Sequence, residues 1–188
     1  STEVGKLLVR ASATNLARIS LELGGQAPFI VFDDADLNAA VAGVLMSKFQ
    51  VNGQSCLCAN RIFAQESIAG EFTERLTEAV GKLTVGPGTS QDTDVGPLID
   101  DRGFAKVSAH VADAVARGAT ITTGGSRVDS LSGGYFFQPT VLSGCTDDML
   151  CVSEETFGPV APVLTFADEE TVIRRANNAR FGLAAYVY

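Results

Sequence analysis

Residues 28–36 read Pro-Phe-Ile-Val-Phe-Asp-Asp-Ala-Asp, and a helical pattern runs on from Leu37 to Gln50. The first five of these residues form a short apolar run, which is typical of strands buried inside parallel sheets. The acidic turn at Asp33 to Asp36 can cap the helix that follows it. Because a second strand pattern comes next, at Arg61 to Gln65, the stretch predicts a strand–helix–strand unit.

The same alternation extends in both directions along the chain. Further helices are expected at Ser1–Ala13, Ala69–Leu83, Arg102–Arg117 and Asp168–Asn178, and further strands at Arg18–Leu23, Thr120–Thr123, Phe136–Leu142, Phe157–Phe166 and the last residues. Gly118 stands where a glycine commonly ends a helix. Alternating strands and helices predict an α/β fold, with a mostly parallel sheet and helices on both faces.

Composition narrows the class of protein. The chain has 188 residues, of which 46% are hydrophobic, so it can bury a core. Its net charge of −8 argues against nucleic acid and anionic membrane as partners. No apolar run approaches the roughly 18 residues that a membrane helix needs. Four cysteines without a disulfide-like spacing favour reduced thiols, and with no signal peptide at the start we expect a cytoplasmic protein.

The two ends suggest a piece of a longer protein. Ser1 enters a helical pattern without an initiator Met, and Tyr188 ends the chain inside an apolar run. Natural domains seldom stop in mid-strand with apolar residues at the tip. We therefore expect further chain on both sides.

The loop Asn52-Gly53-Gln54-Ser55-Cys56-Leu57-Cys58 is the most informative segment. A cysteine after a long helix, flanked by glycine and small polar residues, can be exposed close to backbone donors. Its thiolate would be a strong nucleophile if a nearby base or dipole favoured that form. Considered alone, Cys56 fits a small buried hydrophobe better, because most free cysteines are buried.

Two acidic segments accompany this loop. Glu22 stands between two leucines at the end of an expected strand, and burial would raise its pKa and make it a useful general base. The simpler interpretation is that Glu22 faces solvent. Glu154-Glu155-Thr156-Phe157-Gly158-Pro159 places adjacent acids before an aromatic, which indicates a sugar-hydroxyl acceptor beside a flat apolar surface. Considered alone, this segment fits an acidic turn leading into a strand better.

Together the three segments resemble the signatures of the aldehyde dehydrogenase superfamily. Those signatures are Leu-Glu-Leu-Gly-Gly, then Gly-Gln-x-Cys with its cysteine 34 residues after that glutamate, then Glu-Glu-x-Phe-Gly-Pro. Here Cys56 follows Glu22 by 34 positions (56 − 22), and all three motifs occur in this order. The resemblance spans the chain and implies the catalytic part of such an enzyme, with its Rossmann-like α/β architecture.

The resemblance implies oxidation of an aldehyde to a carboxylic acid with NAD or NADP. Cys56 would attack the carbonyl, giving a thiohemiacetal and, after hydride transfer, a thioester. Glu22 would activate the water that hydrolyses this thioester, and the Cys56 backbone N–H would donate to the oxyanion.

The resemblance also assigns contacts with the cofactor. Ser1 opens a helix whose free N–H groups would face the pyrophosphate. Glu155 would bind the nicotinamide ribose, Phe157 would lie beside the nicotinamide, and Leu23 and Gly24 would lie near the same ring. No metal site is expected.

Domain organisation follows from the same resemblance. Residues 1–23 would be the C-terminal remnant of the dinucleotide-binding domain, and residues 24–188 the catalytic thiol domain, truncated at its C-terminus. Because most of the first domain would be missing, the isolated chain is expected to be inactive. Family members are usually homodimers or homotetramers, so we expect the same of the parent protein.

Several segments look most like succinate-semialdehyde dehydrogenases, among them Ala27–Leu37, Cys56–Arg61 and Glu155–Val163. Members of that group often carry Arg six residues before the nucleophile, where it grips the far carboxylate of the substrate. This chain has Gln50 there, which can hydrogen-bond a carboxylate but cannot neutralise it. Succinate semialdehyde is the expected substrate, with a neutral or differently charged aldehyde as the alternative.

Cys58 has two open interpretations. In extended chain, residues two apart have Cα atoms about 6.6 Å apart, near the roughly 6.8 Å limit for a disulfide. A strained Cys56–Cys58 bond would suit a reversible off-switch, as in relatives with the same Cys-x-Cys. Alternatively, Cys58 packs inward as free cysteines commonly do.

Two other functions compete with the oxidoreductase. One is a cysteine-dependent esterase or acyl-transfer module that uses Cys56 and Glu22 without nicotinamide. The other is a non-catalytic scaffold fragment. His110, the single histidine, lies mid-helix between apolar residues and is expected to be structural.

Overall fold

One six-stranded sheet organises the computed structural model, which describes residues 1–188, with the order β3-β4-β5-β2-β1-β6. The strands are β1 (Ala27–Val31), β2 (Ala59–Gln65), β3 (Thr120–Thr123), β4 (Thr140–Ser143), β5 (Val160–Phe166) and β6 (Tyr186–Val187). Neighbouring strands are parallel except β3 and β4, which are antiparallel. The predicted mostly parallel sheet is confirmed.

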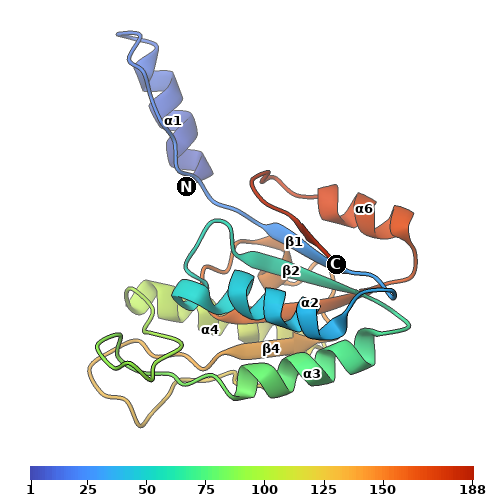
Figure 1. Ribbon diagram of the computed structural model, residues 1–188. Coiled ribbons are helices and arrows are strands. Elements are labelled where there is room, and N and C mark those ends of the chain that lie inside the picture. Colours follow the sequence, from blue (N-terminus) through green and yellow to red (C-terminus); the bar gives the residue numbers. More distant parts are fainter.

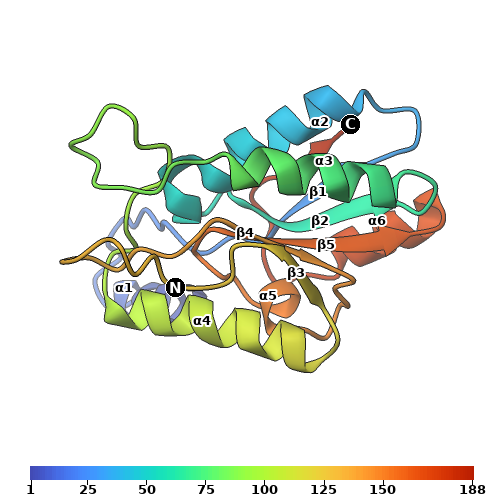
Figure 2. The same cartoon turned by 90° about the horizontal axis from the view of Figure 1, so that it is seen from below.

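Helices cover both faces of this sheet, as expected (Figure 2). On one face lie α2 (Leu37–Val44) and α3 (Ala69–Gly81), whose apolar sides join one buried cluster of 17 residues with β1 and β2. On the other face lie α4 (Asp101–Ala116), α5 (Leu150–Ser153) and α6 (Glu169–Asn177), with a second cluster of 17. Burial of both faces explains why the central strands are continuously apolar.

The strand–helix–strand unit forms as the opening stretch predicts. All five residues of β1 are buried, and Asp36 caps α2 by accepting from the backbone N–H groups of Asn38 and Ala39. After Val44 the helix widens into a π-turn, η1 (Leu45–Phe49), and then a 3₁₀ turn, η2 (Gln50–Gly53). The cysteine loop, Asn52–Cys58, which contains Cys56, begins at this irregular end of the helix.

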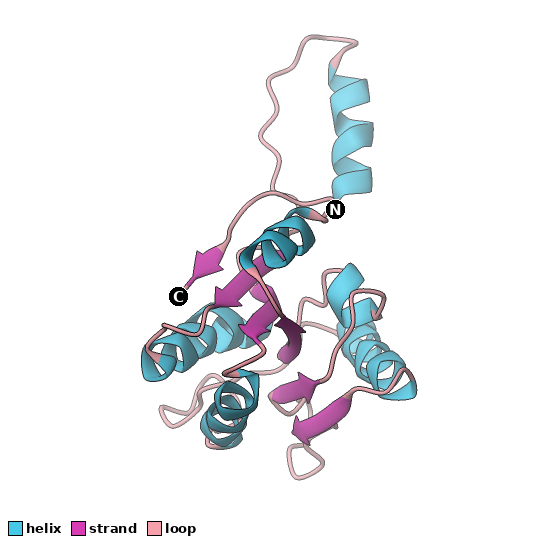
Figure 3. Cartoon of the chain, turned by 90° about the vertical axis from the view of Figure 1, so that its right-hand side faces the viewer, coloured by secondary structure: helices cyan, strands magenta, loops and turns pink.

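The N-terminal segment departs from the rest. Helix α1 (Thr2–Ser12) is capped by Ser1, but it projects away from the sheet, and residues 13–26 run back beside it (Figures 1 and 3). The strand predicted at Arg18–Leu23 is wrong: this segment is irregular. Its alternating pattern has no neighbouring strand to supply a hydrogen-bonded ladder, so it does not join the sheet.

The remaining elements agree with the sequence pattern to within a few residues. Gly118 follows α4 with φ +100°, a left-handed conformation that glycine adopts without strain. The strand expected at Phe136–Leu142 is shorter and later, as β4. None of the helices has the length and apolar character required to span a bilayer.

Candidate active site

Cys56 lies in a turn between η2 and β2. The turn is closed by a hydrogen bond from the Cys58 N–H to the Ser55 carbonyl at 3.1 Å, and the Tyr186 hydroxyl donates to the Leu57 carbonyl at 2.9 Å. No hydrogen bond within the chain uses the Cys56 N–H. The loop is therefore fixed while one backbone donor beside the thiol stays free.

Among the four cysteines, all unbonded, only Cys56 is partly exposed. Cys145 and Cys151 are buried in the core under α4 and α6. The contact with Cys151 and the burial raise the pKa of the Cys145 thiol well above its usual range. Accessibility singles out Cys56 as the thiol that a substrate can reach.

A left-handed turn precedes the loop. Val51, Asn52 and Gly53 have φ values of 52°, 57° and 67°. Valine is rarely found there because a β-branched side chain crowds the backbone in that region. Three such residues in a row reverse the chain sharply after Phe49, and strain of this kind is commonly kept near functional sites.

Glycines bring the three motifs into contact. A Cβ on Gly25 would lie 1.8 Å from the Cys56 carbonyl oxygen, and one on Gly53 would lie 2.2 Å from the Gly158 carbonyl oxygen. The Gly25 N–H donates to Glu155 Oε1 at 2.8 Å. Only glycine allows backbones this close. Segments more than a hundred residues apart therefore meet around the cysteine loop.

A polar groove of about 570 Å³ lies beside this junction. It gathers Glu22 and all five residues predicted to contact a cofactor. Cys56 does not line the groove, but Gln54, two residues before it in the same loop, does. The lining residues are Ser1, Glu22, Leu23, Gly24, Gln54, Ile99, Asp100, Arg102, Gly103, Lys106, Glu155, Thr156 and Phe157.

Three residues singled out in the sequence do not lie as the proposed roles require. Glu22 is exposed in the irregular segment, so the burial assumed for it is absent, although the residue does line the groove. Gln50 is exposed and does not line the groove. Cys58 is buried, with its sulfur 3.6 Å from the Lys48 carbonyl oxygen, so it packs inward.

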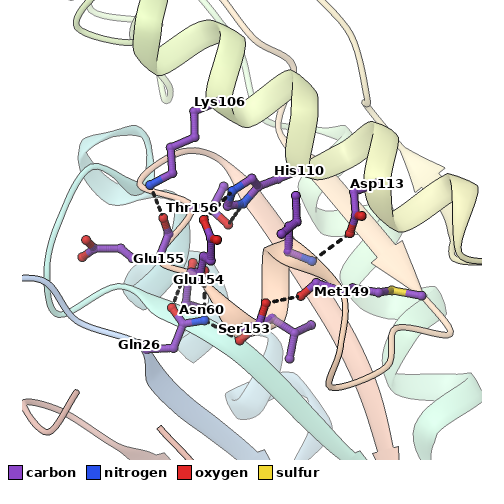
Figure 4. Close-up of polar contacts among 12 residues, drawn as sticks. Gln26, Asn60, Lys106, His110, Asp113, Met149, Ser153, Glu154, Glu155 and Thr156 are labelled. Atoms are coloured by element: carbon purple, nitrogen blue, oxygen red, sulfur yellow. Dashed lines mark hydrogen bonds and ion pairs between the residues drawn. The ribbon is translucent and has the colours of Figure 1, made fainter. Parts of the chain in front are cut away.

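Residues that sequence reasoning missed hold the acidic segment in place (Figure 4). The Lys106 ammonium donates to the Glu155 carbonyl at 2.5 Å, from α4 across the groove. Gln54 ties the cysteine loop to the next loop, because its Oε1 accepts from the Ile99 N–H at 2.9 Å. Nothing in the local pattern around Lys106 separates it from an ordinary exposed lysine.

A buried polar chain supports the same segment from the sheet side. The fully buried Lys48 donates to Asn60 Oδ1 at 2.9 Å, and Asn60 donates in turn to Gln26. The Gln26 amide donates to the Val152 carbonyl at 2.5 Å and the Glu154 carbonyl at 3.0 Å. The one signal of this chain in the sequence was Lys48, a charged residue inside an apolar helix pattern, because a buried lysine needs a polar partner.

Fold and site thus define an α/β protein in which an accessible loop thiol lies near a groove lined by three carboxylates, a flat aromatic and a helix N-terminus. The model of the Aldehyde dehydrogenase family matches residues 1–188. The chain belongs to the aldehyde dehydrogenase family.

Similar proteins and structures agree. The chain is 50% identical over 188 residues to the NADP-dependent succinate-semialdehyde dehydrogenase of Escherichia coli (strain K12), covering 39% of that protein. It is 49% identical to a glutarate-semialdehyde dehydrogenase of Pseudomonas aeruginosa, covering 38%. The crystal structure of succinate-semialdehyde dehydrogenase from Burkholderia pseudomallei superposes on the whole chain with a TM-score of 0.96 at 52% identity, covering 39% of that chain. The chain therefore spans about two fifths of the length of these relatives.

Proposed function

We propose that this chain is the catalytic piece of an NAD(P)-dependent aldehyde dehydrogenase, with Cys56 as nucleophile and Glu22 as general base. The observation that supports this most is the junction around Gly25. Gly25 packs on the Cys56 carbonyl, and the Gly25 N–H donates to Glu155. One small displacement would disturb the nucleophile, the base segment and the ribose-binding acid together.

The proposed chemistry runs through sulfur. The Cys56 thiolate adds to the aldehyde carbon, and the carbonyl electron pair moves to oxygen, where the free Cys56 N–H donates. Ser1, Glu155 and Phe157 would hold NAD(P)⁺, which would supply the hydride acceptor. Once hydride has left that carbon, the carbonyl re-forms as a thioester on Cys56. Glu22 then takes a proton from a water molecule as the water oxygen attacks the thioester carbon. The Cys56 thiolate leaves with the electron pair of the C–S bond.

The groove suits a dinucleotide of this kind. One Glu155 oxygen is occupied by the Gly25 N–H, and the other is left for a ribose hydroxyl. Phe157 is 40% exposed and presents a flat face, and Ser1 brings the N-terminal end of α1 to the groove. A helix N-terminus favours phosphate oxygens through its free N–H groups.

Succinate semialdehyde is the proposed substrate. Relatives at about 50% identity include succinate-semialdehyde dehydrogenases, and the glutarate-semialdehyde enzyme acts on a chemically similar aldehyde acid. Gln50 would hydrogen-bond the distal carboxylate without a bidentate charge pair, so we expect weaker binding than an Arg would give.

A Cys56–Cys58 disulfide switch remains a proposal. Peroxide would oxidise the two thiols to one disulfide and be reduced to water, and Cys58 would have to leave its buried position beside the Lys48 carbonyl. Mass spectrometry after mild peroxide treatment tests the idea. Absence of an intramolecular Cys56–Cys58 link would refute it.

Domain boundaries, assembly and location are proposed on the same basis. Residues 1–23 would close a dinucleotide-binding domain and residues 24–188 would begin the catalytic domain. The parent would be a cytoplasmic homodimer or homotetramer, and the isolated chain would be inactive. Micromolar binding of NAD(P) to the isolated chain, measured calorimetrically, would contradict the last point.

Rapid-mixing kinetics on a full-length protein containing this chain test the mechanism. Wild type should form NAD(P)H with succinate semialdehyde, and Cys56→Ser should form none. Glu22→Gln should still give a first-turnover burst but lose about 10²- to 10⁴-fold in steady-state rate, because only thioester hydrolysis needs the base. Glu170→Gln, an exposed carboxylate on α6, is the matched control. Full activity of Cys56→Ser would overturn the proposal, and thiol-dependent ester hydrolysis without any NAD(P)H would favour the esterase.

A further inference from the structure

His110 is a buried titratable group that the proposed mechanism does not use. It lies on α4, is 2% exposed, and is the single histidine of the chain. Both ring nitrogens face the acidic segment that contains Glu155 and Phe157 (Figure 4). The sequence alone indicated a structural histidine, and the structure shows what it contacts.

The contact with Thr156 fixes the tautomer. Thr156 is 1% exposed, and its hydroxyl has one hydrogen-bond partner, His110 Nδ1 at 3.1 Å. A buried hydroxyl left without an acceptor costs about 1–3 kcal/mol, so its proton points to Nδ1. The ring proton then resides on Nε2, which lies 3.6 Å from Glu154 Oε2.

The segment between these contacts needs such support. Phe157 has φ +56°, a left-handed conformation that costs a non-glycine residue roughly 1–2 kcal/mol. Lys106, one helical turn before His110, holds the Glu155 carbonyl, and Gln26 holds the Glu154 carbonyl from the opposite side. Of these supports, only His110 changes its protonation state within the pH range of cells.

We propose that His110 is a positioning residue, which keeps Glu155 and Phe157 in place for the cofactor by holding Thr156 and Glu154 from α4. This inference rests on the proposed function of the groove. It adds a specific dependence of cofactor affinity on a residue that touches neither cofactor nor substrate.

Acidification should weaken this support. Burial lowers the pKa of His110, and Lys106 lowers it further, while Glu154 and Asp113 oppose the shift. The ring is therefore neutral at pH 7.5. Protonation would place a second donor at Nδ1, facing the Thr156 hydroxyl proton, so the pair would have to reorganise. Cofactor affinity should therefore fall as the pH drops below the ordinary titration range of histidine.

Titration calorimetry with NAD⁺ and NADP⁺ on the full-length protein tests the proposal. At pH 7.5, His110→Leu should raise the Kd for the cofactor about tenfold with the KM for aldehyde little changed, and His110→Asn, which keeps an acceptor near Thr156, should stay within about threefold of wild type. Only wild type should show the loss of affinity at acid pH. Ser108→Ala, whose hydroxyl bonds only to the Phe104 carbonyl of its own helix, is the control.

A second variant keeps the test decisive if His110→Leu fails to fold. Thr156→Val removes the hydroxyl at almost constant volume, and its effect should not add to that of His110→Leu, because both break one contact. Unchanged cofactor affinity in folded His110→Leu would overturn the proposal alone. Wild type that binds neither nucleotide would overturn the proposed function as well.

Imidazole NMR provides an independent test on the 188-residue chain, where a single histidine makes assignment unambiguous. The Nε2–H tautomer is expected at pH 7.5. An Nδ1–H tautomer would contradict the hydrogen bond from Thr156 on which the inference depends.

Discussion

Replacement of Gly25 by alanine is the sharpest test of the junction around Cys56. The new Cβ would lie 1.8 Å from the Cys56 carbonyl oxygen and 2.9 Å from its carbonyl carbon, whereas ordinary contact begins near 3.4 Å. The two segments must therefore separate by about 1.6 Å, the difference between 1.8 and 3.4 Å. Both atoms belong to the backbone, so no side-chain rotation can relieve the clash.

That displacement would act directly on the nucleophile. A misplacement of about 1 Å can cost 10²-fold in rate, so Gly25→Ala should lower kcat/KM by about 100-fold or more. The same crowding should cost about 1–3 kcal/mol of stability. Steady-state NAD(P)H formation by the full-length protein, the rate of iodoacetamide labelling at Cys56 and the Tm measure the three consequences.

Gly70→Ala is the matched control. Gly70 lies in α3 with no neighbour within 4 Å of a Cβ, so alanine should leave activity unchanged and stabilise the helix by about 0.5–1 kcal/mol. If Gly25→Ala kept wild-type kcat/KM and labelling rate, the close contact between Gly25 and Cys56 would not position the nucleophile, and the reasoning would fail.

Two further predictions concern stability. Val51→Asn should raise the free energy of unfolding by about 1 kcal/mol, because asparagine tolerates the left-handed conformation that valine holds at φ 52°; an unchanged or lower urea midpoint would contradict this. The depressed pKa of His110 should make stability fall as the pH drops below about 6.5, where the unfolded chain takes up the proton first, and His110→Asn should lose this phase. Below about pH 4 a second loss should follow, since backbone N–H groups lower the pKa values of the Asp113 and Asp168 carboxyls and their stabilisation ends on protonation; urea midpoints measured from pH 7.5 to pH 3 distinguish the two phases.

The sequence by itself determined the α/β class and most elements, because each depends on local signals. The apolar run at β1, the Asp36 cap and Gly118 after α4 are readable from neighbouring residues. The spacing of the three motifs likewise predicted which cysteine and which acids belong together.

Only the tertiary structure decided how those groups are held. The alternating pattern at Arg18–Leu23 predicted a strand, yet no partner strand pairs with this segment. Glu22 is exposed for the same reason. The acidic segment Glu154–Thr156 is contacted by Lys106, His110 and Gln26. The paired residues lie between 44 positions apart, for His110 and Glu154, and 128 positions apart, for Gln26 and Glu154. No local periodicity encodes such contacts, because they arise when separate layers pack against opposite sides of one loop.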